Sequence, residues 1–169
     1  MKKIILILFL LCNNLFALEK EDNLKVVLTG KIAKFVTWKD SSEEKFVITV
    51  IKNPFNNLFY ENFKNKRIKN RDVLIKYIDD IKDLSFTNIL FIPHVNSKEL
   101  EKILEKTKEK NILTISSIRG FAQKGGAVQI YFVSQKGRIK INLDVLNREK
   151  FKVKSSFVRI AEVVSKGIS

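Results

Sequence analysis

The sequence contains very few of the residues that usually carry covalent or metal chemistry. Its 169 residues include one cysteine and one histidine. Cys12 lies in a predicted export signal, so we expect the processed chain to have no disulfide, thiolate nucleophile or cysteine metal site. Leu11 precedes it where a lipoprotein signal needs a small residue, which disfavours lipidation. His94 has no cysteine, second histidine or close acidic pair around it, and we interpret it as a loop residue rather than a metal ligand or catalytic base.

Catalytic and phosphate-binding motifs are also missing. No Gly-x-Ser-x-Gly elbow presents the serine pairs at 116–117 and 155–156. Gly120 and Gly125 have the spacing of a phosphate loop, but residues 126–127 are Gly-Ala where that loop needs Lys and Ser or Thr. The sequence therefore predicts a protein that is not an enzyme and that uses no cofactor and no metal.

The longest apolar run is short and lies near the N-terminus. Two lysines precede an apolar stretch over 4–11, and Leu-Phe-Ala over 15–17 ends in a small residue, which is the layout of a secretory signal. We predict a signal peptide over 1–17 and one exported domain over 18–169. A bilayer span takes about 20 apolar residues, so we expect no stable membrane span.

The charge is strongly one-sided. The 32 Lys and Arg against 18 Asp and Glu give a net charge of +14, and removal of Lys2 and Lys3 leaves 30 against 18, or +12. Such a balance often indicates nucleic-acid binding. Only six of the basic residues are arginines, which read phosphates and bases bidentately, and an exported protein does not meet the genome. We therefore expect no nucleic-acid partner, and only a moderate attraction to anionic lipid or an acidic partner.

Hydrophobic periodicity predicts alternating strands and helices. Apolar residues at helical spacing predict a helix that follows a cap at Asp22 or Asn23 and runs to about Trp38. Residues 128–143 alternate apolar and polar around a Ser-Gln-Lys-Gly turn, which predicts a hairpin. The remaining predicted elements are strands over 46–51, 72–78, 88–93 and 112–116 and helices over 55–63, 96–110 and 157–164. This order predicts an α/β fold, a single-domain layered sheet that is partly parallel, has a C-terminal antiparallel hairpin and is flanked by helices.

A strand followed by a glycine-bounded loop is the most unusual segment. The loop begins at Gly120 and ends at Gly125 and Gly126, and glycine permits positive φ angles and close approach to another surface. Phe121 inside the loop is either a core residue or an aromatic presented to a partner, and Trp38 offers the same alternatives. We favour the core for both, because aromatic residues dominate cores before they mark interfaces.

Several segments together resemble a known family of periplasmic proteins, the YfiR family. The resemblance covers about residues 24–165. The matching segments are Phe-Val-Thr-Trp over 35–38, Ile-Lys-Asn-Pro-Phe over 51–55, Gly-Phe-Ala-x-x-Gly-Gly over 120–126, Arg-Ile-Lys-Ile-Asn-Leu over 138–143 and Val-Lys-Ser-Ser over 153–156. The chain departs from the family pattern at Lys39, where proline is usual, and over 157–160. It also lacks the cysteines that some members pair, which excludes a redox-sensing role.

The resemblance implies a non-catalytic periplasmic regulator. It would bind the periplasmic part of an inner-membrane diguanylate cyclase and repress it, lowering cyclic di-GMP signalling, and it could form a homodimer. Such a repressor needs no reactive side chain, because about 3 kcal/mol of preference for one conformation of its target shifts a balanced equilibrium more than about a hundredfold. We place the partner surface around the glycine loop and the last helix, at Gly120, Phe121, Gly125, Gly126 and Phe157.

A periplasmic small-ligand-binding sensor domain is the alternative. Ligands of α/β sheets often bind beyond the carboxyl ends of strands. Ser116 and Arg119 follow such an end and are the candidate ligand-binding residues. A hydrolase is the third possibility and would need catalytic groups that come together only in the fold.

Overall fold

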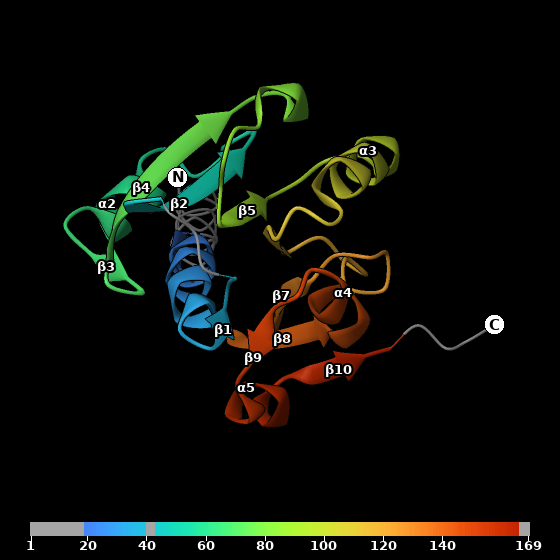
Figure 1. The fold of residues 1–169 in the computed structure, drawn as a ribbon. Coiled ribbons are helices and arrows are strands. Elements are labelled where there is room, and N and C mark those ends of the chain that lie inside the picture. The colour runs from blue at the N-terminus through green and yellow to red at the C-terminus, as the bar shows by residue number, and fades with distance from the viewer. Residues whose placement is uncertain (1–18, 40–42, 166–169) are drawn as a thin grey trace, which may run out of the picture.

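A curled, mostly parallel sheet forms the centre of the protein, with helices on both faces (Figure 1). The computed structural model describes residues 19–39 and 43–165, so the predicted signal peptide lies outside the described residues. The strands of the large sheet lie in the order β10-β8-β7-β6-β5-β2-β4-β3. In chain order they are β2 (Lys45–Ile51), β3 (Arg67–Ile68), β4 (Arg71–Ile78), β5 (Ile89–Ile92), β6 (Leu113–Ser116), β7 (Val128–Val133), β8 (Lys136–Asn142) and β10 (Glu162–Val164).

The direction of the strands confirms the predicted α/β class. Neighbouring strands from β4 through β2, β5 and β6 to β7 are parallel, and β7 and β8 form the predicted antiparallel hairpin. All four residues of β5 and all four of β6 are buried. Strands covered on both faces need such continuous apolar runs, which is why these segments could be predicted.

Alternate residues of the central strands fill two separate cores. Ile89 and Phe91 of β5 belong to one apolar cluster, while Leu90 and Ile92 belong to the other. The first cluster includes side chains of the N-terminal helix, described over 19–33, and of α2 (Leu58–Phe63), α4 (Leu143–Arg148) and α5 (Ser155–Ile160). The second includes side chains of α3 (Ser97–Thr107) and the short η1 (Ile81–Asp83). Because side chains alternate across a strand, the two clusters lie on opposite faces of the sheet.

The N-terminal helix ends earlier than predicted, at residue 33. Val36 and Thr37 form β1 (Val36–Thr37), which pairs antiparallel with β9 (Lys152–Val153) in a second, two-stranded sheet. Trp38 is buried with its ring edge-to-face against Phe46 and Phe151 at 5.1 and 5.6 Å between centroids. The prediction of helix to Trp38 is therefore wrong, because β-branched residues and a strand partner far along the chain outweigh local helical spacing. The core placement of Trp38 is confirmed.

The predicted cap of this helix is also wrong. Asp22 and Asn23 lie within the helix rather than at its start. The Asp22 carboxylate pairs with Lys25 one turn later, at 2.7 Å. By contrast, the cap predicted at Asn96 is confirmed, because its side chain accepts a hydrogen bond from the backbone N–H of Glu99 at 2.9 Å.

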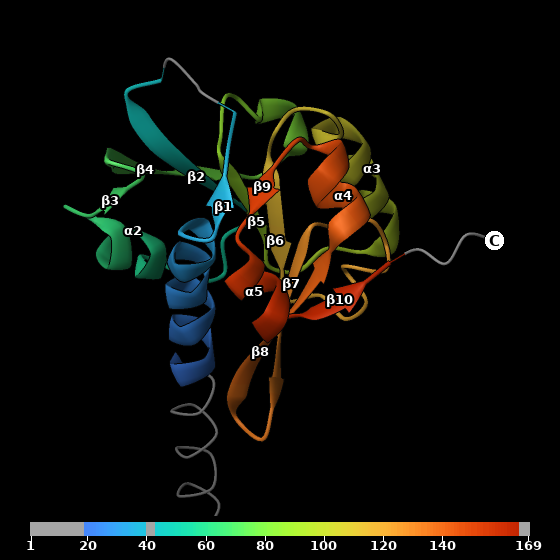
Figure 2. The same ribbon diagram turned by 60° about the horizontal axis from the view of Figure 1, so that its bottom comes forward.

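The C-terminal part differs most from the prediction. A helix over 157–164 is wrong: α5 has six residues and is followed by the edge strand β10, which runs parallel to β8. The segment after the hairpin forms a short helix, α4, because the Asn142 side chain caps it by accepting the N–H of Val145 at 3.0 Å. The hairpin itself extends past the other strands beside the N-terminal helix (Figure 2).

Candidate functional site

The glycine loop packs against the second core through Phe121. Phe121 is fully buried in that cluster, which confirms its placement in the core. Gly120 and Gly125 have φ angles of +74° and +100°, in the region that favours glycine. A side chain at Gly126 would overlap the Phe121 ring, and the Gly126 N–H donates to the Phe121 carbonyl at 3.0 Å. The three glycines therefore let the chain close tightly around one aromatic ring.

Buried polar side chains hold this loop to the sheet. Asn142 donates from Nδ2 to the carbonyl of Ala122 at 2.9 Å. Thr114 accepts the N–H of Ala127 through Oγ1 at 3.0 Å. Both polar side chains are buried and hydrogen-bonded, as buried polar groups need to be. Sequence reasoning missed them, and the only signals were a threonine in the buried strand β6 and an asparagine at the buried end of β8.

The two candidate ligand-binding residues have different surroundings. Ser116 is fully buried, and its Oγ donates to the carbonyl of Ile92 at 2.6 Å and accepts the N–H of Ile118 at 3.0 Å. This hydroxyl therefore joins the ends of β5 and β6. Arg119 is exposed three residues after it along the chain, in the turn that opens the loop. Ligand binding by either residue remains a prediction.

Phe157 does not lie beside the glycine loop. It is fully buried in α5 and stacks on Phe35 of the N-terminal segment, with 5.1 Å between ring centroids. It belongs to the first core cluster, whereas Phe121 belongs to the second, on the opposite face of the sheet. The two phenylalanines therefore do not form one exposed patch. Their part in partner binding stays a prediction, and as buried residues they could contribute only by supporting the surface residues around them.

Apolar side chains are exposed next to Phe157, where the chain passes from α5 to β10. Ile160 is 67% exposed and Val163 is 44% exposed. Glu162 between them accepts from Lys140 Nζ at 2.7 Å and from the Tyr131 hydroxyl at 2.9 Å. These hydrogen bonds, the Lys140 bond foremost, lower the pKa of Glu162 below its usual value. The Glu162 carboxylate thus holds the edge strand to β8 and β7 through two hydrogen bonds, while Val163 of the same strand remains exposed. We call Ile160 and Val163 the α5–β10 edge.

The described residues contain no set of three side chains from His, Cys, Asp and Glu placed to hold a metal ion. His94 is exposed after β5. Over the same described residues, no helix combines the length and apolarity needed to cross a bilayer. The features described so far are a closely packed glycine loop and an exposed apolar edge.

These features define the class of the protein as a layered α/β domain. The sequence model of the YfiR/HmsC-like family matches residues 22–162, and the chain belongs to this family. The family is a regulatory one. The resemblance seen in the sequence is therefore confirmed.

Comparison with other proteins adds the fold alone. No curated protein sequence matches the chain. Nine chains of solved structures match, and one of them is the ABC domain in complex with L-Trp from Streptococcus pneumonia, with a TM-score of 0.56 and 9% sequence identity. The alignment covers 85% of this chain and 60% of that one, so the protein spans less than two thirds of the length of this structural neighbour.

Proposed function

We propose that the protein is a non-catalytic periplasmic regulator that binds the periplasmic part of an inner-membrane diguanylate cyclase and holds the enzyme inactive. The observation that carries the proposal is the family match over residues 22–162. Residues 1–17 would direct export and be removed, leaving a basic domain in the periplasm. Removal of the regulator from its partner would then raise cyclic di-GMP inside the cell.

The α5–β10 edge is the part of the surface that we assign to the partner. Ile160 and Val163 are large apolar side chains that remain exposed, although Phe157 in the same short helix as Ile160 is fully buried. A partner that covers these apolar side chains removes them from water, which favours binding. Phe157 supports this edge from below, since α5 packs through it onto Phe35.

Affinity capture tests the proposal. The tagged protein is expressed in its own cell, crosslinked and recovered from the membrane fraction, and the captured proteins are identified by mass spectrometry. We expect an inner-membrane protein with a diguanylate cyclase domain. Recovery of a bound small molecule with no protein partner would contradict the repressor proposal and favour the sensor alternative.

Two surface variants make the capture specific for the α5–β10 edge. Ile160→Glu places a charge in the proposed contact and should abolish capture while the protein stays folded, because the side chain is exposed. Val133→Glu is the matched control at the hairpin tip, where the side chain is 52% exposed. Equal capture by Ile160→Glu and Val133→Glu would place the partner on another surface.

A further inference from the structure

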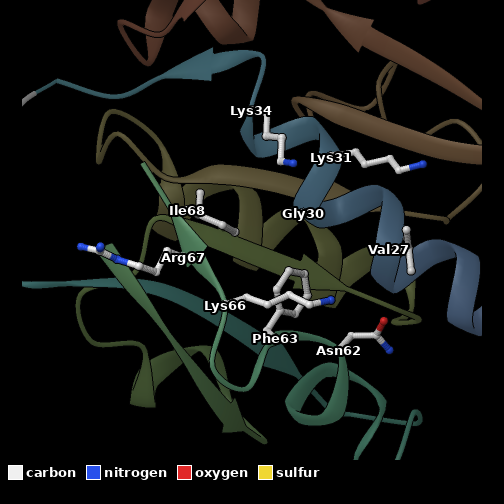
Figure 3. Close-up of a pocket in the computed structure, with 9 residues that line it drawn as sticks. All are labelled: Val27, Gly30, Lys31, Lys34, Asn62, Phe63, Lys66, Arg67 and Ile68. Atoms are coloured by element: carbon white, nitrogen blue, oxygen red, sulfur yellow. The ribbon is translucent and has the colours of Figure 1, made fainter. Parts of the chain in front are cut away.

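A cavity lies between the N-terminal helix and the segment that joins α2 to β3. Its volume is about 310 Å³, near the lower end of the range found for small-molecule sites. Val27, Gly30 and Lys31 of the helix and Lys34 in the turn after it line one side, and Asn62, Phe63, Lys66, Arg67 and Ile68 line the other (Figure 3). The site is therefore built from two segments that are about 30 residues apart in the chain.

Close packing of Phe63 against Gly30 shapes the floor. A Cβ at Gly30 would come within 2.7 Å of Phe63 Cε1, so only glycine lets the ring reach the helix backbone. Phe63 and Ile68 are both buried. The floor is thus apolar and fixed, and it could receive the apolar part of a ligand.

Positive charge surrounds this apolar floor. Four of the lining residues are cationic and none is acidic. Among the described residues, the side chains of Lys31, Lys34 and Lys66 have no carboxylate partner. Arg67 contacts Asp72 at 3.4 Å, but both side chains are largely exposed, so the pair is weak.

Two lysines next to the cavity form ion pairs, unlike the three lysines that line it. Lys25, on the same helix, pairs with Asp22, and Lys64, two residues before Lys66, pairs with Glu61. The nearby carboxylates are therefore used outside the cavity. Burial first, and the charge of Lys154 second, lower the pKa of Lys69 in the turn after β3.

We propose that this cavity binds an amphiphilic organic anion, a small molecule with an acidic head group and an apolar body. The head group would lie among Lys31, Lys34 and Lys66, where it gains charge-assisted hydrogen bonds, and the apolar body would cover Phe63 and Ile68. The proposal concerns a different surface from the α5–β10 edge and does not depend on the cyclase partner.

Octanoate is the probe, because it combines a carboxylate head group with an apolar chain. Binding to the purified protein is measured by calorimetry at fixed ionic strength, and the site is located by NMR shift changes. Octanamide keeps the apolar chain without the charge, and acetate keeps the charge without the chain. We expect octanoate to bind at least about tenfold more tightly than either, with shift changes centred on Gly30, Phe63 and Ile68.

A charge-matched pair of variants separates the cavity from general attraction to a basic protein. The triple variant Lys31→Gln, Lys34→Gln and Lys66→Gln should weaken octanoate binding by about tenfold or more. The control variant Lys45→Gln, Lys98→Gln and Lys108→Gln removes three exposed charges elsewhere and should bind octanoate unchanged. Circular dichroism checks that both variants stay folded.

Four results would overturn the proposal: no octanoate binding, equal binding of octanamide, equal losses in the two triple variants, or shift changes away from the cavity. Binding to phosphatidylglycerol vesicles without binding to octanoate would also overturn it, since the lysines would then serve a lipid surface. Because cyclase capture is measured separately, failure of the octanoate test leaves the proposed function standing.

Discussion

The aromatic ring of Phe121 packs directly against Gly126, at the place where a side chain at position 126 would begin. The contact closes the glycine loop and fills the second core. Gly126→Ala should therefore lower the free energy of unfolding by about 1–3 kcal/mol, as overpacked cores do. Urea unfolding measures the change.

A second substitution tests the cause. Phe121→Leu removes the part of the ring that meets position 126, so Gly126→Ala should cost much less in the Phe121→Leu background than in the natural protein. Additive losses in the double variant would show that the alanine acts through the backbone rather than through the ring.

Glu149 joins two turns from inside the protein. Its buried carboxylate accepts the backbone N–H groups of Glu109 at 3.0 Å and Asn111 at 3.2 Å, and it pairs with Arg148 at 3.1 Å. Glu149→Ala should lower the free energy of unfolding by about 1–3 kcal/mol or more, because two backbone donors lose their acceptor. The exposed Glu105→Ala is the control and should change little.

Trp38 is the only tryptophan and anchors the segment after the N-terminal helix. Its Nε1 donates to the Asn88 carbonyl at 3.0 Å, and that carbonyl also accepts the N–H of Leu113 at 2.9 Å. Trp38→Phe should cost only about 1 kcal/mol, because the acceptor keeps one partner. Trp38→Ala should cost about 3–5 kcal/mol, because it also opens a cavity beside Phe46. If Trp38→Ala lowered the free energy of unfolding no more than Trp38→Phe does, this packing would be contradicted.

Attachment of β10 should weaken in acid. The pKa of Glu162 is lowered in the folded protein, first by the hydrogen bond from Lys140 and then by that from Tyr131. A lowered folded pKa gives stability that is present above the unfolded pKa and is lost as the pH falls through the folded pKa. Glu162→Gln should therefore reduce stability near pH 7 and have less effect near pH 3, by urea unfolding. An equal effect at both pH values would show that charge is not involved.

Local sequence patterns predicted the central strands but not the short strands β1, β9 and β10. β2, β5 and β6 could be read because strands buried on both faces leave continuous apolar runs. β1 pairs with β9 more than a hundred residues away, and its two residues carry no such signal. Helical spacing therefore continued past residue 33 in the prediction, although the chain turns into a strand there.

The candidate site could be predicted only in part, for a similar reason. The spacing of Gly120, Gly125 and Gly126 indicated a tight loop, and the buried ring of Phe121 explains that spacing. The sequence could not show that Phe157 lies in a different core, because the face that a residue occupies depends on strand order. The cationic cavity was missed because its two sides are far apart in the chain.

The cellular level of cyclic di-GMP tests the central claim most directly. It is measured in cells that lack the gene, in the same cells carrying the natural gene, and in cells carrying Ile160→Glu. Repression through the α5–β10 edge predicts a rise on deletion, a return to the original level with the natural gene, and no return with a folded, exported Ile160→Glu protein. An unchanged level on deletion, in cells that express a membrane diguanylate cyclase, would contradict the account.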